Sequence, residues 1–395
     1  MENGAVYLKK GEGRSMKAGG PWLYDNEVER IEGEPLDGDV VSVHDYNGFC
    51  LGKGFLNRRS KLRVRMLTRN RNQEIDEDFL RMRVENAWEY RKKVVDTGSC
   101  RVIFGEADFL PGLVVDKFSD VLVVQSLALG MDRYKSFILE TLKELMAKDG
   151  ISIRGIYERS DAKVREHEGM PRVKGFLSDP FDTKVEIVEN GVRYFVDVAE
   201  GQKTGFFVDQ RENRALLERY AKDRSVLNMF CYTGGFSFYA MRGGAKLVHS
   251  VDSSSKAIDL TNKNVELNFP GDPRHEAYAE DAFKYLDRMG DQYDLIVLDP
   301  PAFAKHKDAL RNALQGYRKL NAKAFEKIKP GGILFTFSCS QVVTKDNFRT
   351  AVFTAAAMSG RSVRILHQLT QPADHPVNIY HPEGEYLKGL VLYVE

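Results

Sequence analysis

Four apolar runs in the second half of the chain constrain its fold more than any other feature of the sequence. The runs consist mainly of Val, Leu, Ile, Met and Phe, so both faces of each strand would be buried, as in a parallel sheet covered by helices. From about residue 190, strands alternate with helical stretches, which predicts βαβ units and an α/β fold. The predicted strands are 226–230, 247–251, 295–298 and 333–337.

The rest of the chain predicts two further domains, because 395 residues are too many for one ordinary core. Short apolar alternations between glycine turns predict a small β-barrel in residues 1–72. Residues 73–188 predict an α+β domain, and residues 189–395 predict the α/β domain. The middle domain is expected to have helices at 76–95 and 131–147, and strands within 101–115, 121–129, 155–158 and 185–188.

Composition gives weaker constraints. The chain has 58 Lys and Arg against 57 Asp and Glu, a net charge of +1 that neither favours nor excludes nucleic acid. The start, Met1 to Gly4, has no leader pattern, and no apolar run approaches the ~18 residues that span a bilayer. The four cysteines are far apart, so neither a disulfide framework nor a metal site is expected. A cytoplasmic protein with no membrane partner is expected.

The segment from Lys53 to Arg71 contains eight basic residues and no acidic residue. Within the predicted strand 62–67, arginines alternate with apolar residues, so one face would be core and the other cationic. That face is either a solvated strand surface or a surface that binds RNA phosphates. The candidate RNA-binding residues here are Arg58, Arg59, Arg63 and Arg65.

The ends of the predicted parallel strands carry the pattern of a nucleoside site. The first strand runs into a glycine turn at Gly234 that lacks the G-x-G-x-x-G spacing, which disfavours a nicotinamide cofactor. Asp252 follows the second strand, where a carboxylate can accept both ribose hydroxyls. Asp281 follows a third short segment and is placed to bind an adenine amine, and Asp299 closes the fourth strand.

These residues belong to a wider resemblance that covers nearly the whole chain. With the segments 20–24, 104–116, 201–211, 299–303, 337–340 and 382–389, the chain resembles the RlmI type of ribosomal RNA cytosine-5 methyltransferase. The resemblance implies an N-terminal PUA-like RNA-binding barrel, a middle α+β domain and a Rossmann-like class I methyltransferase domain. It also implies S-adenosylmethionine as cofactor, large-subunit ribosomal RNA as partner, and a homodimer.

The resemblance also implies roles for individual residues. Asn228, Phe230, Tyr232 and Gly234 would line the methionine end of the cofactor. Asp252 would hold the ribose and Asp281 the adenine. Phe207, Asp209 and Gln210 would close over the cofactor.

Carbon 5 of cytosine is too weak a nucleophile to take a methyl group unaided. A thiolate that adds at C6 makes C5 nucleophilic, so a placed cysteine is needed. Cys339 follows the last predicted strand, and Asp299 at the end of the neighbouring strand could hydrogen-bond N3. Cys50 and Cys100 are expected to be small buried residues, and Cys231 to be structural. Pro301 stands where related enzymes carry a second cysteine, so the base that removes the C5 proton is not identified.

Two alternatives remain open at this point. The segment Asp299-Pro-Pro-Ala-Phe303 also resembles the loop of enzymes that methylate exocyclic amines, where Phe303 would stack on a flipped base. Such enzymes need no thiol, so Cys339 favours the carbon-5 reaction. The second alternative is a catalytically idle RNA-binding or assembly protein, which the intact cofactor motifs disfavour.

Overall fold

The computed structural model describes residues 4–395 and places them in two compact units. The expectation that the chain starts without a leader pattern rests partly on residues 1–3, which lie outside the described residues. The first unit contains the described residues up to Ile187, with Val196–Val208 and Ala373–Gly384; the second contains Val188–Phe195, Asp209–Pro372 and Glu385–Glu395.

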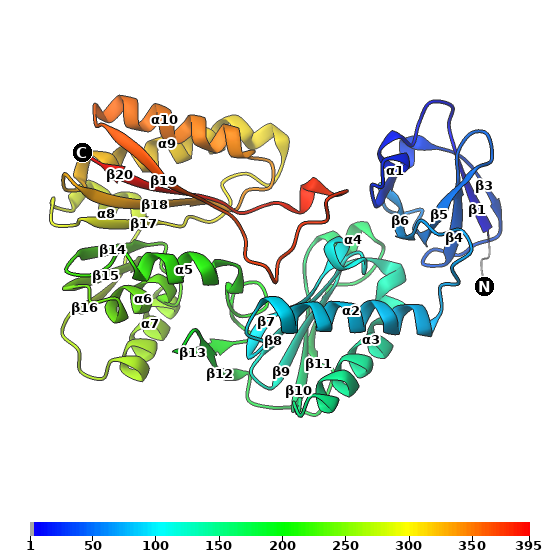
Figure 1. Cartoon of the computed structure of the whole chain (residues 1–395), viewed down its shortest axis with the longest axis horizontal. Coiled ribbons are helices and arrows are strands. Elements are labelled where there is room, and N and C mark those ends of the chain that lie inside the picture. Colours follow the sequence, from blue (N-terminus) through cyan, green and yellow to red (C-terminus); the bar gives the residue numbers. More distant parts are fainter. Residues whose placement is uncertain (1–3) are drawn as a thin grey trace. The chain divides into compact units, whose positions relative to one another are not determined.

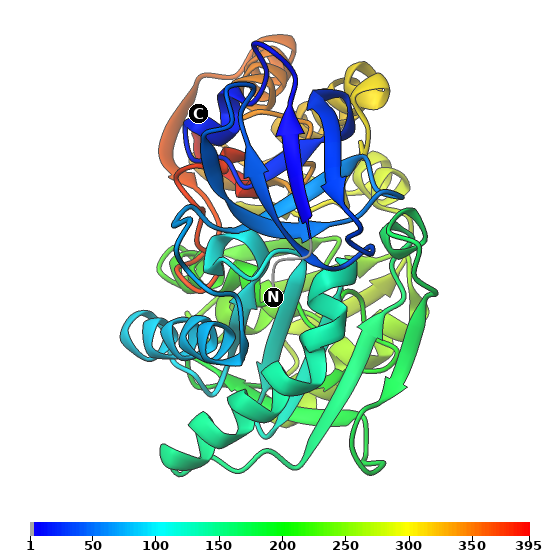
Figure 2. The same cartoon turned by 90° about the vertical axis from the view of Figure 1, so that its right-hand side faces the viewer.

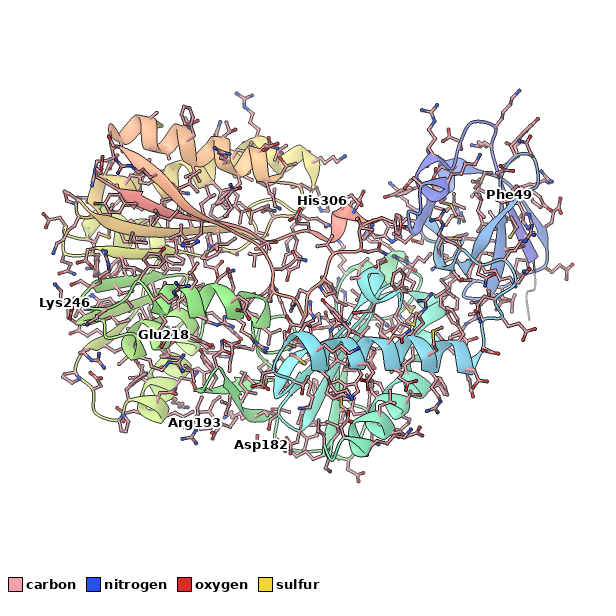
Figure 3. All side chains as sticks on the ribbon, viewed as in Figure 1. Phe49, Asp182, Arg193, Glu218, Lys246 and His306 are labelled. Carbon is pink, nitrogen blue, oxygen red and sulfur yellow. The ribbon has the colours of Figure 1, made fainter. Side chains whose placement is uncertain are left out.

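The N-terminal part of the first unit is a six-stranded sheet, drawn in blue in Figure 1 and seen from another side in Figure 2. The strand order is β2-β6-β5-β4-β1-β3, and neighbours are antiparallel except for the parallel pair β1 and β4. The turn between β4 and β5 carries Phe49, which is labelled in Figure 3. The elements are β1 Gly4–Leu8, α1 Arg14–Lys17, β2 Trp22–Tyr24, η1 Asp25–Glu27, β3 Val28–Gly33, β4 Val40–His44, β5 Cys50–Leu56 and β6 Leu62–Thr68.

The rest of the first unit is built on a five-stranded sheet with the order β11-β10-β9-β8-β7. The Asp76 side chain accepts a hydrogen bond from the Phe79 N–H (2.9 Å), which fixes the start of the first long helix. The predicted run 101–115 contains two strands, because the short helix η2 turns the chain between them. The elements are α2 Glu77–Val94, β7 Ser99–Phe104, η2 Gly105–Asp108, β8 Leu113–Phe118, β9 Val121–Ser126, α3 Leu129–Lys148, β10 Gly155–Ser160, α4 Val164–His167 and β11 Val173–Phe176.

The hairpin β12 (Lys184–Glu189) and β13 (Val192–Asp197) precedes the sheet of the second unit, whose order is β16-β15-β14-β17-β18-β20-β19. Strands β14 to β18 are parallel, and β20 is antiparallel to both of its neighbours. Helices α5 to α7 cover one face and α8 to α10 the other (Figure 1). The elements are η3 Val208–Gln210, α5 Arg211–Glu218, β14 Ser225–Met229, α6 Gly235–Arg242, β15 Leu247–Asp252, α7 Ser255–Asn268, β16 His275–Ala279, α8 Ala282–Arg288, β17 Leu295–Leu298, η4 Lys307–Ala309, α9 Leu310–Lys327, β18 Gly332–Ser338, α10 Lys345–Ser359, β19 Val363–Leu369, η5 Pro382–Gly384 and β20 Lys388–Val394.

The order of these strands confirms the predicted parallel sheet and locates its ligand edge. The chain runs from β14 outward to β16 and then crosses to β17 on the other side of β14. Open α/β sheets bind ligands at the carboxyl ends of the strands where the order reverses, which here is between β14 and β17. All residues of β14, β17 and β18 are buried, as expected for strands covered on both faces.

The domain boundaries at residues 72 and 188 stay a prediction. However, two segments that the sequence analysis assigned to the third domain, Val196–Val208 and Ala373–Gly384, belong to the first compact unit. The Thr204 hydroxyl donates to the Asp116 carboxylate (2.5 Å), and Asp374 accepts from the Arg101 N–H (3.0 Å). These long-range hydrogen bonds hold both segments on the middle sheet, a grouping that chain order does not reveal. No helix within residues 4–395 combines the length and apolar character of a membrane span.

Candidate active site

The carboxyl ends of four parallel strands bring the predicted site residues to one edge of the sheet. Met229 at the end of β14 pairs with Val251 of β15 and Leu298 of β17, and Leu298 pairs with Thr336 of β18. The segments that follow these strands therefore start side by side. They carry the loop 230–234, Asp252, Asp299 and Cys339.

The loop after β14 has an unusual backbone. Phe230, Tyr232 and Gly234 have φ angles of 58°, 49° and 87°. Non-glycine residues seldom adopt positive φ, and such strain persists where contacts fix it. Here the Tyr232 N–H donates to Asp252 Oδ2 (3.0 Å), and its carbonyl accepts from Thr261 Oγ1 (3.0 Å). A Cβ at Gly234 would lie 2.5 Å from a neighbouring aromatic ring, so both conformation and space require glycine.

The two predicted nucleoside-binding acids lie at the ends of β15 and β16. Asp252 is half-buried, and besides the Tyr232 N–H it accepts from the Ser254 N–H (2.9 Å). A carboxylate has about four acceptor positions, so two hydrogen bonds leave capacity for a ligand. Asp281 is exposed and caps α8 by accepting from the Lys284 N–H (3.1 Å). Both acids are therefore ordered by backbone donors at the ligand edge.

Asn228 begins a buried chain of polar side chains. Its Nδ2 donates to Ser237 Oγ (2.9 Å), which lies 2.7 Å from Ser250 Oγ, and Ser250 Oγ lies 2.8 Å from His275 Nε2. Burial lowers the pKa of His275 to about 4, so this ring is neutral at neutral pH. Asn228 Oδ1 has no hydrogen-bond partner among residues 4–395. A buried acceptor without a donor costs about 1–3 kcal/mol.

Cys339 and Asp299 lie at the ends of neighbouring strands, as the sequence predicts. The Cys339 thiol is half-buried and lies 3.9 Å from the carbonyl oxygen of Pro300. The Asp299 carboxylate is also half-buried, and its Oδ2 accepts from Gln210 Nε2 (3.1 Å). The edge thus combines a partly accessible thiol with an oriented carboxylate, the two groups that the predicted chemistry requires.

Hydroxyl groups fix the backbone on both sides of Cys339. Ser338 Oγ donates to the Tyr317 hydroxyl (2.9 Å), which lies 3.1 Å from Ser340 Oγ, and both serines are fully buried. Ser340 Oγ also accepts a backbone N–H of the loop after β17 (3.3 Å). The half-buried Phe303 ring packs on Tyr317 with centroids 4.6 Å apart. The loop continues to His306, which is labelled in Figure 3.

Lys388 is a candidate functional residue that the sequence analysis missed. It is only 4% exposed, and its ammonium donates to the carbonyl oxygens of Ser340 (2.6 Å) and Tyr386 (2.7 Å). Burial lowers the pKa of Lys388 to about 8. The only signal in the sequence was a lysine at the start of the apolar run Lys388–Val394. Its neighbours become evident only from the antiparallel pairing of β18 with β20, in which Ser338 lies opposite Lys388.

The three residues predicted to close over the cofactor have different surroundings. Asp209 is buried and accepts from the Tyr386 hydroxyl (2.6 Å). Gln210 is buried, donates to Asp299 and accepts from Asn213 Nδ2 (2.6 Å), so it is tied to the Asp299 carboxylate. Phe207 groups with the first unit, where the Lys203 ammonium lies 4.4 Å from its ring centroid.

The other three cysteines differ from Cys339 in their surroundings. Cys100 is fully buried, as predicted. Cys231 is buried in the loop after β14, and burial raises the pKa of its thiol well above the usual value, which fits the structural role predicted for it. The prediction for Cys50 is wrong, because this side chain is partly exposed at the start of β5.

The predicted cationic face of β6 is wrong at Arg65. This side chain is buried, and its guanidinium forms ion pairs with Glu106 (3.3 Å) and Glu168 (3.0 Å). Strand alternation could not reveal this, because the covering acids come from the middle of the chain. Arg63 is half-buried, and its Nη1 donates to the Asn57 carbonyl (3.3 Å). Arg58 and Arg59 are exposed.

A different part of the basic segment lines a cavity of about 790 Å³. Arg69 and Arg71 follow β6 and are exposed, and Lys17 and Phe49 also line the cavity. Phe49 is 61% exposed, which is unusual for an aromatic side chain. Cations beside an exposed aromatic ring form a surface suited to nucleic acid.

Comparison with known families shows to which protein family the chain belongs. A family model described as S-adenosylmethionine-dependent methyltransferase matches residues 162–386, more than half of the chain. The chain belongs to this family. Residues 6–69 match a PUA-like domain. The predicted cofactor, S-adenosylmethionine, and the predicted fold, a methyltransferase domain with an N-terminal PUA-like domain, are confirmed.

Curated relatives match the methyltransferase over its whole length. Ribosomal RNA large subunit methyltransferase I of Pseudoalteromonas translucida is 42% identical, with 99% of each chain covered. The protein of the same name from Aeromonas hydrophila is 39% identical, with 98% of each chain covered. Among solved structures, SMU.776 complexed with SAH has a TM-score of 0.83 at 22% identity, with 100% of both chains covered. This last likeness shows a shared fold.

Proposed function

We propose that this methyltransferase forms 5-methylcytosine in large-subunit ribosomal RNA through a covalent adduct between Cys339 and the base. The substrate class follows from the relatives that share its full length and carry the name ribosomal RNA large subunit methyltransferase I. The observation that carries the carbon-5 reaction is the half-buried Cys339 thiol 3.9 Å from the Pro300 carbonyl, one residue from Asp299.

In the proposed reaction, Cys339 forms and releases the covalent adduct, and Asp299 acts on the base. The Cys339 thiolate forms a bond to C6 of cytosine, and the electrons of the C5–C6 double bond make C5 nucleophilic. Asp299, in its carboxylic acid form, donates a hydrogen bond to N3 and so stabilises the negative charge that develops in the ring. S-adenosylmethionine supplies the methyl group that C5 receives. A base that the sequence does not identify then removes the C5 proton, and the electrons of the C5–H bond re-form the C5–C6 double bond as the thiolate leaves C6.

The loop after β14 and the acids beside it hold the cofactor in this proposal. Asn228, on β14, lines the methionine end of the cofactor. The fixed backbone of Phe230, Tyr232 and Gly234 lets that end approach closely. Asp252 accepts the ribose hydroxyls, and exposed Asp281 accepts the adenine amine. Phe207, Asp209 and Gln210 cover the cofactor, with Gln210 also orienting Asp299.

The PUA-like domain supplies RNA affinity that does not depend on sequence. Arg69 and Arg71 bind phosphates while Phe49 stacks on a base at the cavity that they line. Exposed Arg58 and Arg59, with half-buried Arg63, extend the contact. Phe303 stacks on the target base beside Cys339. A cytoplasmic location and a homodimer complete the proposal.

The product of the reaction tests this proposal. The enzyme is incubated with unmodified large-subunit RNA and cofactor carrying a labelled methyl group, and the RNA is digested to nucleosides. Label in 5-methylcytidine is the expected result. Label on an exocyclic amine would replace the proposal with the reaction in which Asp299 and Phe303 carry the site. No label in any nucleoside, with intact cofactor binding, would indicate an idle RNA-binding protein.

A further inference from the structure

The surroundings of Lys388 are unusual for a buried lysine. Buried ammonium groups are normally paired with a carboxylate. Lys388 donates instead to two neutral carbonyl oxygens, those of Ser340 and Tyr386. Ser340 directly follows Cys339, and the Tyr386 hydroxyl donates to Asp209.

Three charged groups act on the Lys388 ammonium: anionic Cys339 and Glu385 attract it, and Lys345 repels it. Glu385 also attracts the ammonium, but its carboxylate forms an ion pair with Lys345. Among these charged neighbours, Cys339 in its anionic form raises the pKa of Lys388 most, against the larger lowering caused by burial. Tyr317, the titratable group that bonds both flanking serines, stays neutral because burial raises its pKa.

We propose that Lys388 is a positioning residue whose ammonium holds Cys339 in the thiolate form. The inference rests on the proposed role of Cys339 as nucleophile. The thiol proton passes to solvent, and the neighbouring ammonium stabilises the anion that remains. When the thiolate bonds to C6 its charge moves into the ring, and when the adduct breaks down the ammonium stabilises the departing thiolate. Lys388 therefore serves both the formation and the release of the adduct.

Alkylation of Cys339 tests the inference without RNA and without turnover. The full-length enzyme reacts with iodoacetamide over a pH series, and peptide mass spectrometry reads Cys339 separately from the other three cysteines. A free thiol is half ionised near pH 8.5. The expected midpoint for Cys339 in the parent enzyme lies at least one pH unit lower. Lys388→Met is expected to return the midpoint to about 8.5 and to slow alkylation at pH 7 about tenfold, while Lys388→Arg keeps most of the rate.

Two controls separate this effect from a general disturbance. Lys319→Met removes an exposed lysine from α9 of the same unit and should leave the Cys339 midpoint unchanged. Cofactor affinity should persist in Lys388→Met. If that variant does not fold, the parent profile decides alone. A parent midpoint at or above pH 8.5, or an unchanged midpoint in folded Lys388→Met, would overturn the inference. Failure of the proposed function would be detected in the separate product analysis, where the label would appear in a nucleoside other than 5-methylcytidine.

Discussion

The Cys339 thiol lies 3.9 Å from the carbonyl oxygen of Pro300, although 39 positions separate the two residues in the chain. Their strands, β18 and β17, are parallel neighbours, so the residues after each strand start at the same edge. Asp299 immediately precedes Pro300, and Gln210 orients its carboxylate. The sheet thereby combines a thiol and a carboxylate that neither segment supplies alone.

Asp252→Ala should weaken S-adenosylmethionine binding by about 1.5–3 kcal/mol. This is the range for loss of a charge-assisted hydrogen bond, and the substitution also removes the acceptor of the Tyr232 N–H. Isothermal calorimetry measures the change. Asp291→Ala, at an exposed position of the same unit, should bind the cofactor like the parent. Unchanged affinity in folded Asp252→Ala would remove this residue from the cofactor site.

Arg65→Gln should destabilise the first unit by about 3–5 kcal/mol. The substitution leaves the buried carboxylate of Glu168 and the half-buried carboxylate of Glu106 without their shared guanidinium, and breaking a buried ion pair costs this much. Arg63→Gln, two residues away on a half-buried side chain, should cost less than about 1 kcal/mol. Urea unfolding of both variants measures the difference. Equal stability of the two would contradict the structural role assigned to Arg65.

Replacing Arg69 and Arg71 with Gln should weaken RNA binding for all sequences tested. Loss of two phosphate contacts should also reduce the slope of log affinity against log salt by about one to two. Filter binding at several salt concentrations measures both quantities, and cofactor affinity should not change. Arg30→Gln on β3, an exposed arginine of the same sheet, is the matched control. If slope and affinity both match the parent, the cavity does not bind RNA.

His275 should make the second unit less stable in mild acid. Burial lowers its folded pKa to about 4, below the value near 6.5 expected when unfolded. Between these values the unfolded chain binds more protons, so stability falls as the pH drops from 6.5 to 4. His275→Gln should flatten this part of the dependence. Urea midpoints measured across that range check it, and an equally steep decline in the variant would refute it.

Much of the fold could be predicted because its strands can be recognised from their local sequence. The strands ending at Met229, Leu298 and Ser338 are apolar on both faces, and this pattern alone indicates a covered parallel sheet. In such a sheet the positions of Asp252, Asp299 and Cys339 follow from strand order. Candidate site residues that lie directly after a strand could therefore be located from the sequence.

The features that were missed depend on contacts between distant segments. Arg65 alternates with apolar residues like an exposed strand residue, but Glu106 and Glu168 come from the middle of the chain to cover it. Lys388 lies at the start of an apolar strand, and only the antiparallel register with β18 brings it beside Ser340. No local pattern distinguishes such residues from ordinary surface cations.

Trapping with 5-fluorocytosine tests the covalent mechanism most directly. The enzyme is incubated with cofactor and large-subunit RNA that contains 5-fluorocytidine, then denatured, and mass spectrometry locates any protein–RNA adduct. The fluorine cannot leave as a proton does, so we expect a stable adduct at Cys339. Cys339→Ala should lose both the adduct and methylation of ordinary RNA while still binding the cofactor, and Cys100→Ala, at a buried cysteine of the first unit, should keep all three. Full methylation by Cys339→Ala, with no adduct in the parent enzyme, would contradict the account.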